Sequence, residues 1–244
     1  MKKLIRLALA RSGYQIQSTK YIPRQLLNPD LLRVIDLDDI VCRRMFQSGQ
    51  ALTFIQIGAF DGVSTDPLYK YIGRYAWRGV MLEPQPRPAS KLRELYAGNE
   101  AIVILEAALD RERGKRMLYT VESDAAPVWA GGMASFQREH IVKHAYLIPG
   151  LEGMIRELTV DCITFDDVFD QLPSGQVDLL QIDAEGADAQ ILMLFPFERA
   201  KPAIIHWEIK NLTRVRQEEC LEMLSGFGYR FARSGGEDMM AVLG

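Results

Sequence analysis

The feature that most constrains this chain is an alternation of short apolar runs with helix signals. The first three runs, at residues 52–57 (LTFIQI), 80–82 and 101–106 (AIVILE), are short and β-rich. Asp66-Pro67 and Pro88 mark helix starts between them, because Asp caps a helix and Pro fits its first turn. Strand, helix, strand, helix, strand is the pattern of a parallel sheet with crossover helices.

The alternation resumes nearer the C-terminus. Residues 177–182 (VDLLQI) predict a strand, residues 187–194 a helix, and residues 203–209 a further strand. Residues 229–233 and 239–243 follow, and the short Ser-Gly-Gly-Glu turn between them forces two antiparallel strands. The sequence therefore predicts an α/β fold. Its Rossmann-like sheet is mostly parallel, with one antiparallel C-terminal strand and helices on both faces.

Composition limits the organisation and the partners of the chain. With 244 residues and 48% hydrophobic content, it can form one large domain, which we expect at residues 51–244 after a helical appendage at residues 1–50. This appendage should hold a basic amphipathic first helix and a second helix at residues 37–48. The net charge of −3 argues against a nucleic-acid partner, which requires a concentrated positive field. No apolar run approaches the roughly 20 residues that span a bilayer, and cysteines without metal-ligand spacing favour a cytoplasmic protein.

The middle of the chain is less regular. Residues 116–121 predict a strand, residues 130–134 (AGGMA) a loop, and residues 135–146 a helix. His140 and His144 would share one face of that helix. We interpret this face as solvated, because the Glu of a zincin motif is absent. Long loops at the ends of such sheets are usually functional, so residues 121–158 are a candidate lid over the ligand site.

Glycines and acidic residues follow the predicted strands. Ligands of an open parallel sheet bind beyond the carboxyl ends of its strands, so these tips should form the site. The tips are Gly58-Ala59-Phe60-Asp61-Gly62, Glu83-Pro84, Glu106-Ala107-Ala108, Asp183-Ala184-Glu185-Gly186 and Glu208. Clustered acids repel one another, so a cation, polar ligand groups or protonation must compensate.

The first two tips discriminate between nucleotide ligands. Gly58 and Gly62 allow the backbone to approach a ligand closely. The loop lacks the third glycine of G-x-G-x-x-G, and Asp61 would repel a pyrophosphate, which argues against a nicotinamide dinucleotide. Glu83 lies where nucleoside-binding sheets carry an acid that accepts both ribose hydroxyls. The pattern favours a nucleoside ligand with a cationic or amine end.

Three segments carry a resemblance to a known family. FIQIGAFDGVSTDPL, VMLEPQP and LLQIDAEGAD resemble the FkbM-type family of S-adenosylmethionine-dependent methyltransferases, over about residues 52–243. The resemblance implies a class I methyltransferase fold and methyl transfer to a hydroxyl oxygen of a sugar, glycan or natural product, with residues 121–158 as the acceptor lid. It also implies that Gly58, Asp61 and Glu83 hold the cofactor and that Asp183 and Glu185 border the transfer site. Together with the strand tips, this leads us to expect a cofactor site of Gly58, Asp61, Gly62, Glu83, Pro84, Ala107, Ala108 and Asp183, and catalytic roles for Asp183, Glu185 and Glu208.

Physical chemistry suggests roles within that set. The N–H groups of the Gly58 loop can bind the carboxylate of S-adenosylmethionine, Asp61 or Asp183 its amine, and Glu83 its ribose. The two alanines after the third strand can flank adenine. Methyl transfer is an in-line displacement, so positioning supplies much of the rate. Removing the proton of the acceptor hydroxyl is the remaining problem.

Two mechanisms fit the acidic residues. Asp183 or Glu185 can act as a general base, which we favour. Alternatively, Asp183, Glu185 and Glu208 bind magnesium or manganese, and the cation lowers the pKa of the hydroxyl.

Two rival functions stay open: a nicotinamide-dependent oxidoreductase, and a non-catalytic nucleotide-binding module on the same fold. The expected partner is a small-molecule or saccharide acceptor. A homo-oligomer is compatible with the sequence.

Overall fold

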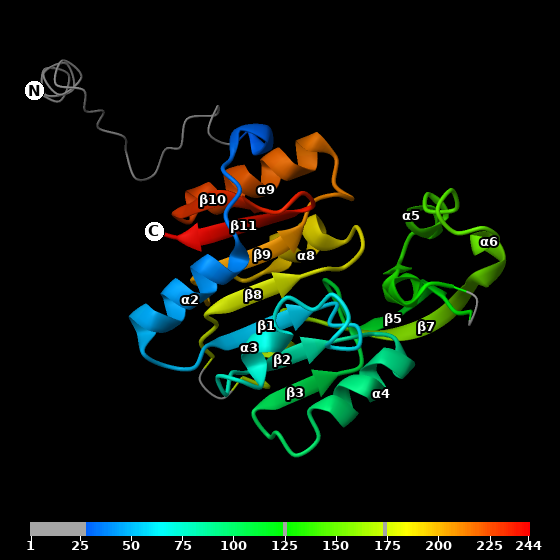
Figure 1. Ribbon diagram of the computed structural model, residues 1–244, viewed down its shortest axis with the longest axis horizontal. Coiled ribbons are helices and arrows are strands. Elements are labelled where there is room, and N and C mark those ends of the chain that lie inside the picture. Colours follow the sequence, from blue (N-terminus) through cyan, green and yellow to red (C-terminus); the bar gives the residue numbers. More distant parts are fainter. Residues whose placement is uncertain (1–27, 124–125, 173–174) are drawn as a thin grey trace, which may run out of the picture.

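The computed structural model describes residues 28–123, 126–172 and 175–244 (Figure 1). Its main element is a seven-stranded sheet in the order β10-β11-β9-β8-β1-β2-β3. The strands are β1 (Thr53–Ile57), β2 (Arg78–Leu82), β3 (Ile102–Leu105), β8 (Leu179–Ile182), β9 (Ile204–Glu208), β10 (Tyr229–Ser234) and β11 (Asp238–Leu243). The expected first helix of the chain lies outside the described residues.

The sheet is mostly parallel, as predicted. Every neighbouring pair is parallel except those of β11, which runs antiparallel to both β9 and β10. The chain passes from β1 outward to β2 and β3, and then returns to β8 on the other side of β1. This reversal of strand order opens a crevice at the carboxyl ends of β1 and β8, where ligands of such sheets bind.

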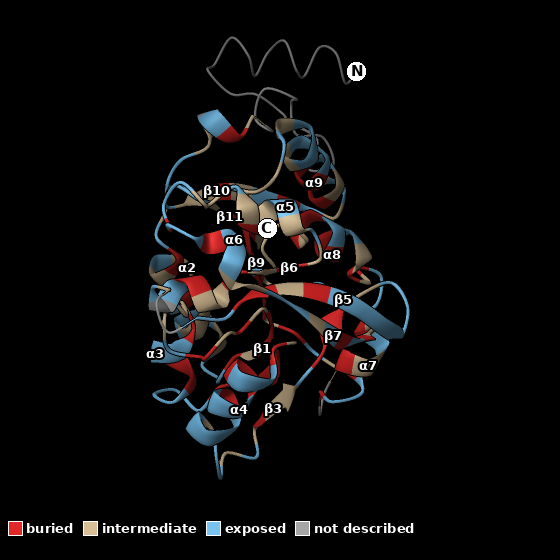
Figure 2. Ribbon diagram, turned by 90° about the vertical axis from the view of Figure 1, so that its right-hand side faces the viewer, coloured by how far each residue is buried: buried red, intermediate tan, exposed pale blue. Residues whose placement is uncertain are grey.

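Helices cover both faces of the sheet, and buried residues fill the layers between them (Figure 2). One hydrophobic cluster joins Phe54 and Met81 to α2 (Leu37–Ser48), α3 (Tyr69–Ile72) and α4 (Pro86–Leu95). A second cluster joins Ile55 and Trp207 to α7 (Phe165–Phe169), α8 (Asp188–Leu194) and α9 (Arg214–Gly226). Phe54 and Ile55 point to opposite faces of the main sheet because side chains alternate along a strand.

Several helices begin elsewhere than expected. α2 has the predicted bounds, and it packs on the sheet through buried Leu37 and Val41. α3 begins at Tyr69 rather than at Asp66-Pro67, and the Asp66 carboxylate accepts the Leu68 N–H at 2.7 Å just ahead of it. α4 begins at Pro86 instead of Pro88. A 3₁₀ helix, η2 (Pro29–Leu31), precedes α2.

A second, four-stranded sheet stands beyond the carboxyl edge of the main sheet (Figures 1 and 2). Its order is β4-β7-β5-β6, with β4 (Ala108–Leu109), β5 (Gly114–Val121), β6 (Ala134–Ser135) and β7 (Ile155–Ile163). Between β5 and β7 lie η3 (Val128–Gly132), α5 (Arg138–Val142) and α6 (Leu151–Met154). These elements enclose their own small hydrophobic cluster, which includes Met133, Ile141 and Leu151.

This region differs from the structure that the sequence predicts. The predicted loop at residues 130–134 contains the end of η3 and the start of β6, and the predicted helix at residues 135–146 shrinks to α5. Strand β7 was missed altogether. Within the described ranges, every helix is too short or too polar to span a bilayer.

Candidate functional site

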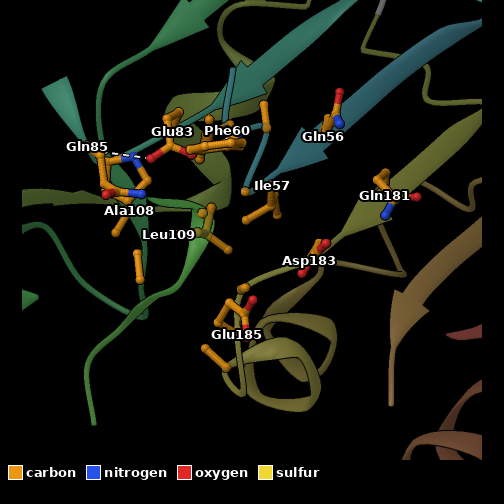
Figure 3. A pocket seen from close by; sticks show the side chains of 18 of the residues that line it. Gln56, Ile57, Phe60, Glu83, Gln85, Ala108, Leu109, Gln181, Asp183 and Glu185 are labelled. Carbon is orange, nitrogen blue, oxygen red and sulfur yellow. Dashed lines mark hydrogen bonds between the residues drawn. The ribbon is translucent and has the colours of Figure 1, made fainter. Parts of the chain in front are cut away.

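A pocket opens between the carboxyl ends of β1, β2 and β8 and the second sheet (Figure 3). It contains about 1040 Å³ of empty space, its open mouth included. Of the residues expected at the site, those that line the pocket are Gly58, Glu83, Pro84, Ala107, Ala108, Asp183 and Glu185. Asp61, Gly62 and Glu208 lie outside its lining.

Gly58 makes the crevice possible. Its φ of +78° belongs to the left-handed region, and an added Cβ would lie 2.8 Å from the carbonyl carbon of Asp183 and still closer to the carbonyl oxygen. Backbone atoms cannot yield to such a contact, so the tips of β1 and β8 approach each other only because residue 58 is glycine.

The N–H groups of Gly58, Ala59 and Phe60 are already bonded. Gly58 and Ala59 both donate to the Leu82 carbonyl at 3.0 Å, and the Phe60 N–H donates to Glu83 Oε2 at 2.8 Å. These donors hold the tips of β1 and β2 together. These three N–H groups are therefore not free donors for a ligand carboxylate.

Asp61 and Gly62 stabilise the loop after β1 through contacts within the protein. The Asp61 carboxylate accepts the N–H groups of Val63 and Ser64 at 3.1 and 2.7 Å, and the Ser64 hydroxyl at 2.9 Å. Partial burial works to raise the pKa of Asp61, but these hydrogen bonds outweigh it and lower the pKa. A Cβ on Gly62 would lie 2.5 Å from Cδ2 of Leu92, so this glycine allows the loop to pack on α4.

Glu83 is a buried acid at the tip of β2. It is 3% exposed, and its two oxygens accept the N–H groups of Phe60 and Gln85 at 2.8 and 2.9 Å. Burial raises the pKa of Glu83 to about 7. Each carboxylate oxygen has a second lone pair, so Glu83 can still accept two hydroxyl groups from a ligand.

Asp183 follows β8 and faces the open pocket. Its side chain is exposed to the pocket, while protein surrounds it on the remaining sides. No hydrogen-bond partner of its carboxyl is found among the described residues. Burial, aided by the negative charges of Glu208 and Asp188, raises the pKa of Asp183 well above its usual range. A carboxyl with increased proton affinity and a free face can accept a proton from a bound molecule.

Glu185 and Glu208 share one donor, Asn211. Asn211 Nδ2 donates to Glu208 Oε2 at 2.7 Å and to Glu185 Oε2 at 3.2 Å, and Lys210 pairs with Glu208 at 2.6 Å. Burial raises the pKa of Glu208. Glu185 has a positive φ of 45°, and its carbonyl accepts the Ser135 hydroxyl at 3.1 Å. Across the described ranges, no three His, Cys, Asp or Glu residues are grouped so that they could hold a metal ion.

The predicted solvated histidine face is wrong. His140 is half-buried, with Nδ1 3.3 Å from the Glu185 carbonyl, and a Cβ on Gly186 would collide with its ring. His144 is also half-buried. Helix α5 thus packs against the loop that carries Asp183 and Glu185.

The pocket also contains residues of two kinds that the sequence did not predict there. Trp129 of η3 and Phe136, which follows β6, bring aromatic rings from the part of the chain that forms the second sheet, and the sequence did not predict this sheet. Gln56 and Gln181 lie within β1 and β8 and are 2% and 4% exposed. A signal for them was present, because each is a polar residue inside an apolar strand.

Comparison with known proteins gives one family match and several distant structural likenesses. The family model of the methyltransferase FkbM domain matches residues 56–231. A methyltransferase FkbM from Methylobacillus flagellatus KT has 13% identity and a TM-score of 0.44, over 79% of this chain and 43% of that one. This chain thus spans less than half the length of that protein.

Two further solved structures are similar to the chain. The fibrillarin pre-rRNA processing protein of Methanococcus jannaschii has 14% identity and a TM-score of 0.37, over 79% of this chain and 66% of that one. An O-methyltransferase from Bacillus cereus in complex with SAH has 12% identity and a TM-score of 0.39, over 98% of this chain and 97% of that one. No curated protein gives a significant match.

Proposed function

The chain belongs to the FkbM methyltransferase family, and from this premise we propose that it transfers the methyl group of S-adenosylmethionine to a hydroxyl oxygen. One observation carries the proposal. Asp183, an acid with a raised pKa and no partner of its own among the described residues, faces the same pocket as Glu83. The first can accept a proton and the second can bind a ribose.

The pocket fits the cofactor at its nucleoside end. Glu83 retains lone pairs for two ribose hydroxyls. Ala107, Ala108 and Leu109 offer an apolar wall on which adenine can lie. Gly58 supports the nucleoside end of the pocket because it shapes the loop after β1. Asp61 and Gly62 support this end only indirectly, since neither residue lines the pocket.

Asp183 is the proposed general base. When bound, S-adenosylmethionine supplies an electrophilic methyl group on a sulfonium. Asp183 accepts the proton of the acceptor hydroxyl as the oxygen–methyl bond forms and the sulfur–methyl bond breaks. Glu185 borders the same space, and Asn211 holds its carboxylate. Glu208 raises the pKa of Asp183 by its negative charge and acts from behind the pocket wall.

The charge of the pocket supports an uncharged acceptor such as a sugar, glycan or hydroxylated natural product. Among the described residues that line it, four are acidic (Asp66, Glu83, Asp183 and Glu185) and none is Lys, Arg or His. A phosphate or carboxylate on the acceptor would be repelled. Trp129, which is 45% exposed, and Phe136 offer aromatic faces on the side of the second sheet.

Calorimetry and a transfer assay test the proposal. We expect S-adenosylmethionine and S-adenosylhomocysteine to bind and NAD not to bind. We also expect labelled methyl to reach a neutral hydroxylated acceptor, but not its phosphorylated form, and Asp183→Asn to abolish transfer without loss of cofactor affinity. Binding of NAD alone would instead identify an oxidoreductase. Tight adenosyl binding with no transfer across a broad acceptor panel would identify a non-catalytic module.

A further inference from the structure

Glu185 holds a backbone conformation that its residue type rarely adopts. Its φ of +45° lies in the left-handed region, which glycine, asparagine and aspartate tolerate better than glutamate. The Glu185 carbonyl accepts the Ser135 hydroxyl at 3.1 Å, and Nδ1 of His140 lies 3.3 Å from the same oxygen. Gly186 has no Cβ, which leaves room for the His140 ring. The fold thus maintains a strained residue at the pocket, and such strain clusters at functional sites.

The negative charge of Glu185 also opposes its surroundings. Burial and neighbouring negative charges, that of Glu185 among them, raise the pKa of Asp183, so the two carboxyl groups lie within electrostatic reach. Burial and the charge of Glu185 likewise raise the pKa of Glu208. Nearby Lys210 pairs with Glu208 and Glu237, at 2.6 and 3.5 Å. An asparagine at position 185 would remove both the repulsion and the backbone strain, so glutamate there must serve another purpose.

The carboxylate of Glu185 is oriented by one oxygen and offers the other to the pocket. Its Oε2 accepts Asn211 Nδ2 at 3.2 Å, and Lys143 of the loop after α5 donates to Asn211 Oδ1, which directs the Asn211 N–H groups toward the acids. In the part of the chain that the structure describes, no donor reaches Oε1. Glu185 lines the pocket, and Figure 3 shows it on the same side as Asp183. A carboxylate only accepts hydrogen bonds, so its complement in a ligand is a donor such as a hydroxyl.

We propose that Glu185 accepts a hydrogen bond from a second hydroxyl of the acceptor, next to the hydroxyl that is methylated. This assignment rests on the proposed function, in which Asp183 accepts the proton of the first hydroxyl. Two neighbouring carboxyl groups match two adjacent hydroxyl groups, and the substrate class is therefore a neutral acceptor with adjacent hydroxyls. His140 is a positioning residue, because it contacts the Glu185 carbonyl and does not line the pocket.

Paired acceptors isolate the second hydroxyl. The methyl glycosides of glucose, galactose and fucose are assayed beside monodeoxy forms that lack a hydroxyl next to the methylated position. In the unaltered protein we expect KM to be about tenfold to a hundredfold higher for the monodeoxy form. Glu185→Asn should raise KM of the parent glycoside to that of its monodeoxy form, leave the latter KM unchanged, and change kcat less than about threefold.

Matched variants separate recognition from folding. Exposed Glu139→Gln on α5 should alter neither KM. His140→Ala should lower the KM ratio of the two acceptors, and His140→Asn, which keeps a donor at the place of Nδ1, should preserve it. Glu185→Asn should bind S-adenosylhomocysteine normally and unfold at no lower urea concentration, because asparagine tolerates the left-handed backbone.

The possible failures differ from one another. A KM ratio near one in the unaltered protein, or a ratio that survives in Glu185→Asn, would overturn the assignment. A collapse of kcat for both acceptors in Glu185→Asn would overturn it in favour of Glu185 as the base, and a lower urea midpoint in favour of a structural role. If no glycoside is methylated, the proposed function fails, and this assignment fails with it.

Discussion

Substitution of Gly58 tests whether the site depends on close contact between the tips of β1 and β8. Gly58→Ala adds a methyl group in a left-handed conformation, which costs about 1–2 kcal/mol for any residue other than glycine. The same methyl group would lie 2.8 Å from the Asp183 carbonyl carbon and nearer still to its oxygen. Because both sides of the contact are backbone, the strands must separate, and we expect a total cost of more than about 4 kcal/mol.

Gly98→Ala is the matched control. Gly98 follows α4 with a φ of +81°, and an added Cβ would meet nothing within 4 Å. This variant should therefore show the conformational cost alone, about 1–2 kcal/mol. Urea unfolding followed by circular dichroism measures both, and calorimetry with S-adenosylhomocysteine should find binding kept in Gly98→Ala and lost in Gly58→Ala. Equal unfolding free energies for the two variants would refute the close approach.

Three further predictions concern the acids. Burial raises the Glu83 pKa to about 7, and ribose hydroxyls donate best to the ionised form, so affinity for S-adenosylhomocysteine should fall about tenfold per pH unit below about pH 7 and level off above it. Calorimetry across pH 5–8.5 should show this slope disappear in Glu83→Gln. Since Asp183 must be ionised to accept a proton, transfer should increase as pH rises through its raised pKa; a rate that does not vary with pH would exclude it as the base. Asn211→Ala leaves Glu185 and Glu208 without their shared donor and should cost about 1–3 kcal/mol in urea unfolding.

The main sheet could be predicted because its signals are local. Each parallel strand is a short apolar run, and Pro, Asp or Gly marks the boundary of the helix that follows. The second sheet has weaker signals, and of its strands the sequence predicts β5, at residues 116–121. Strand β7 alternates exposed charged residues such as Glu157 and Asp161 with apolar ones, and it pairs with β4 and β5, which lie far away in the sequence. Non-local pairing of short strands is set by tertiary packing rather than by the pattern within any one segment.

The candidate site, too, was only partly predictable from the sequence. Position at a strand tip correctly indicated that Glu83 and Asp183 face one pocket. It could not indicate that Asp61 would turn back to accept the N–H groups of Val63 and Ser64, although Asp commonly does so in turns. Nor could it indicate that Lys210 would pair with Glu208 behind the pocket wall. A tip position specifies an edge of the sheet, whereas local hydrogen bonds decide which way the carboxylate points.

The two halves of the pocket are held by separate hydrophobic clusters. Glu83 and Asp183 lie at the tips of strands that belong to the core of the main sheet. Trp129 lies in η3, next to Ala130 of the same helix. Ala130 and Met133 belong to the small cluster formed with α5 and α6. Substitutions in this small cluster can therefore reshape the proposed acceptor wall while the core that supports the proposed cofactor end stays packed. Acceptor choice should thus depend on the part of the chain whose fold is least evident from its sequence.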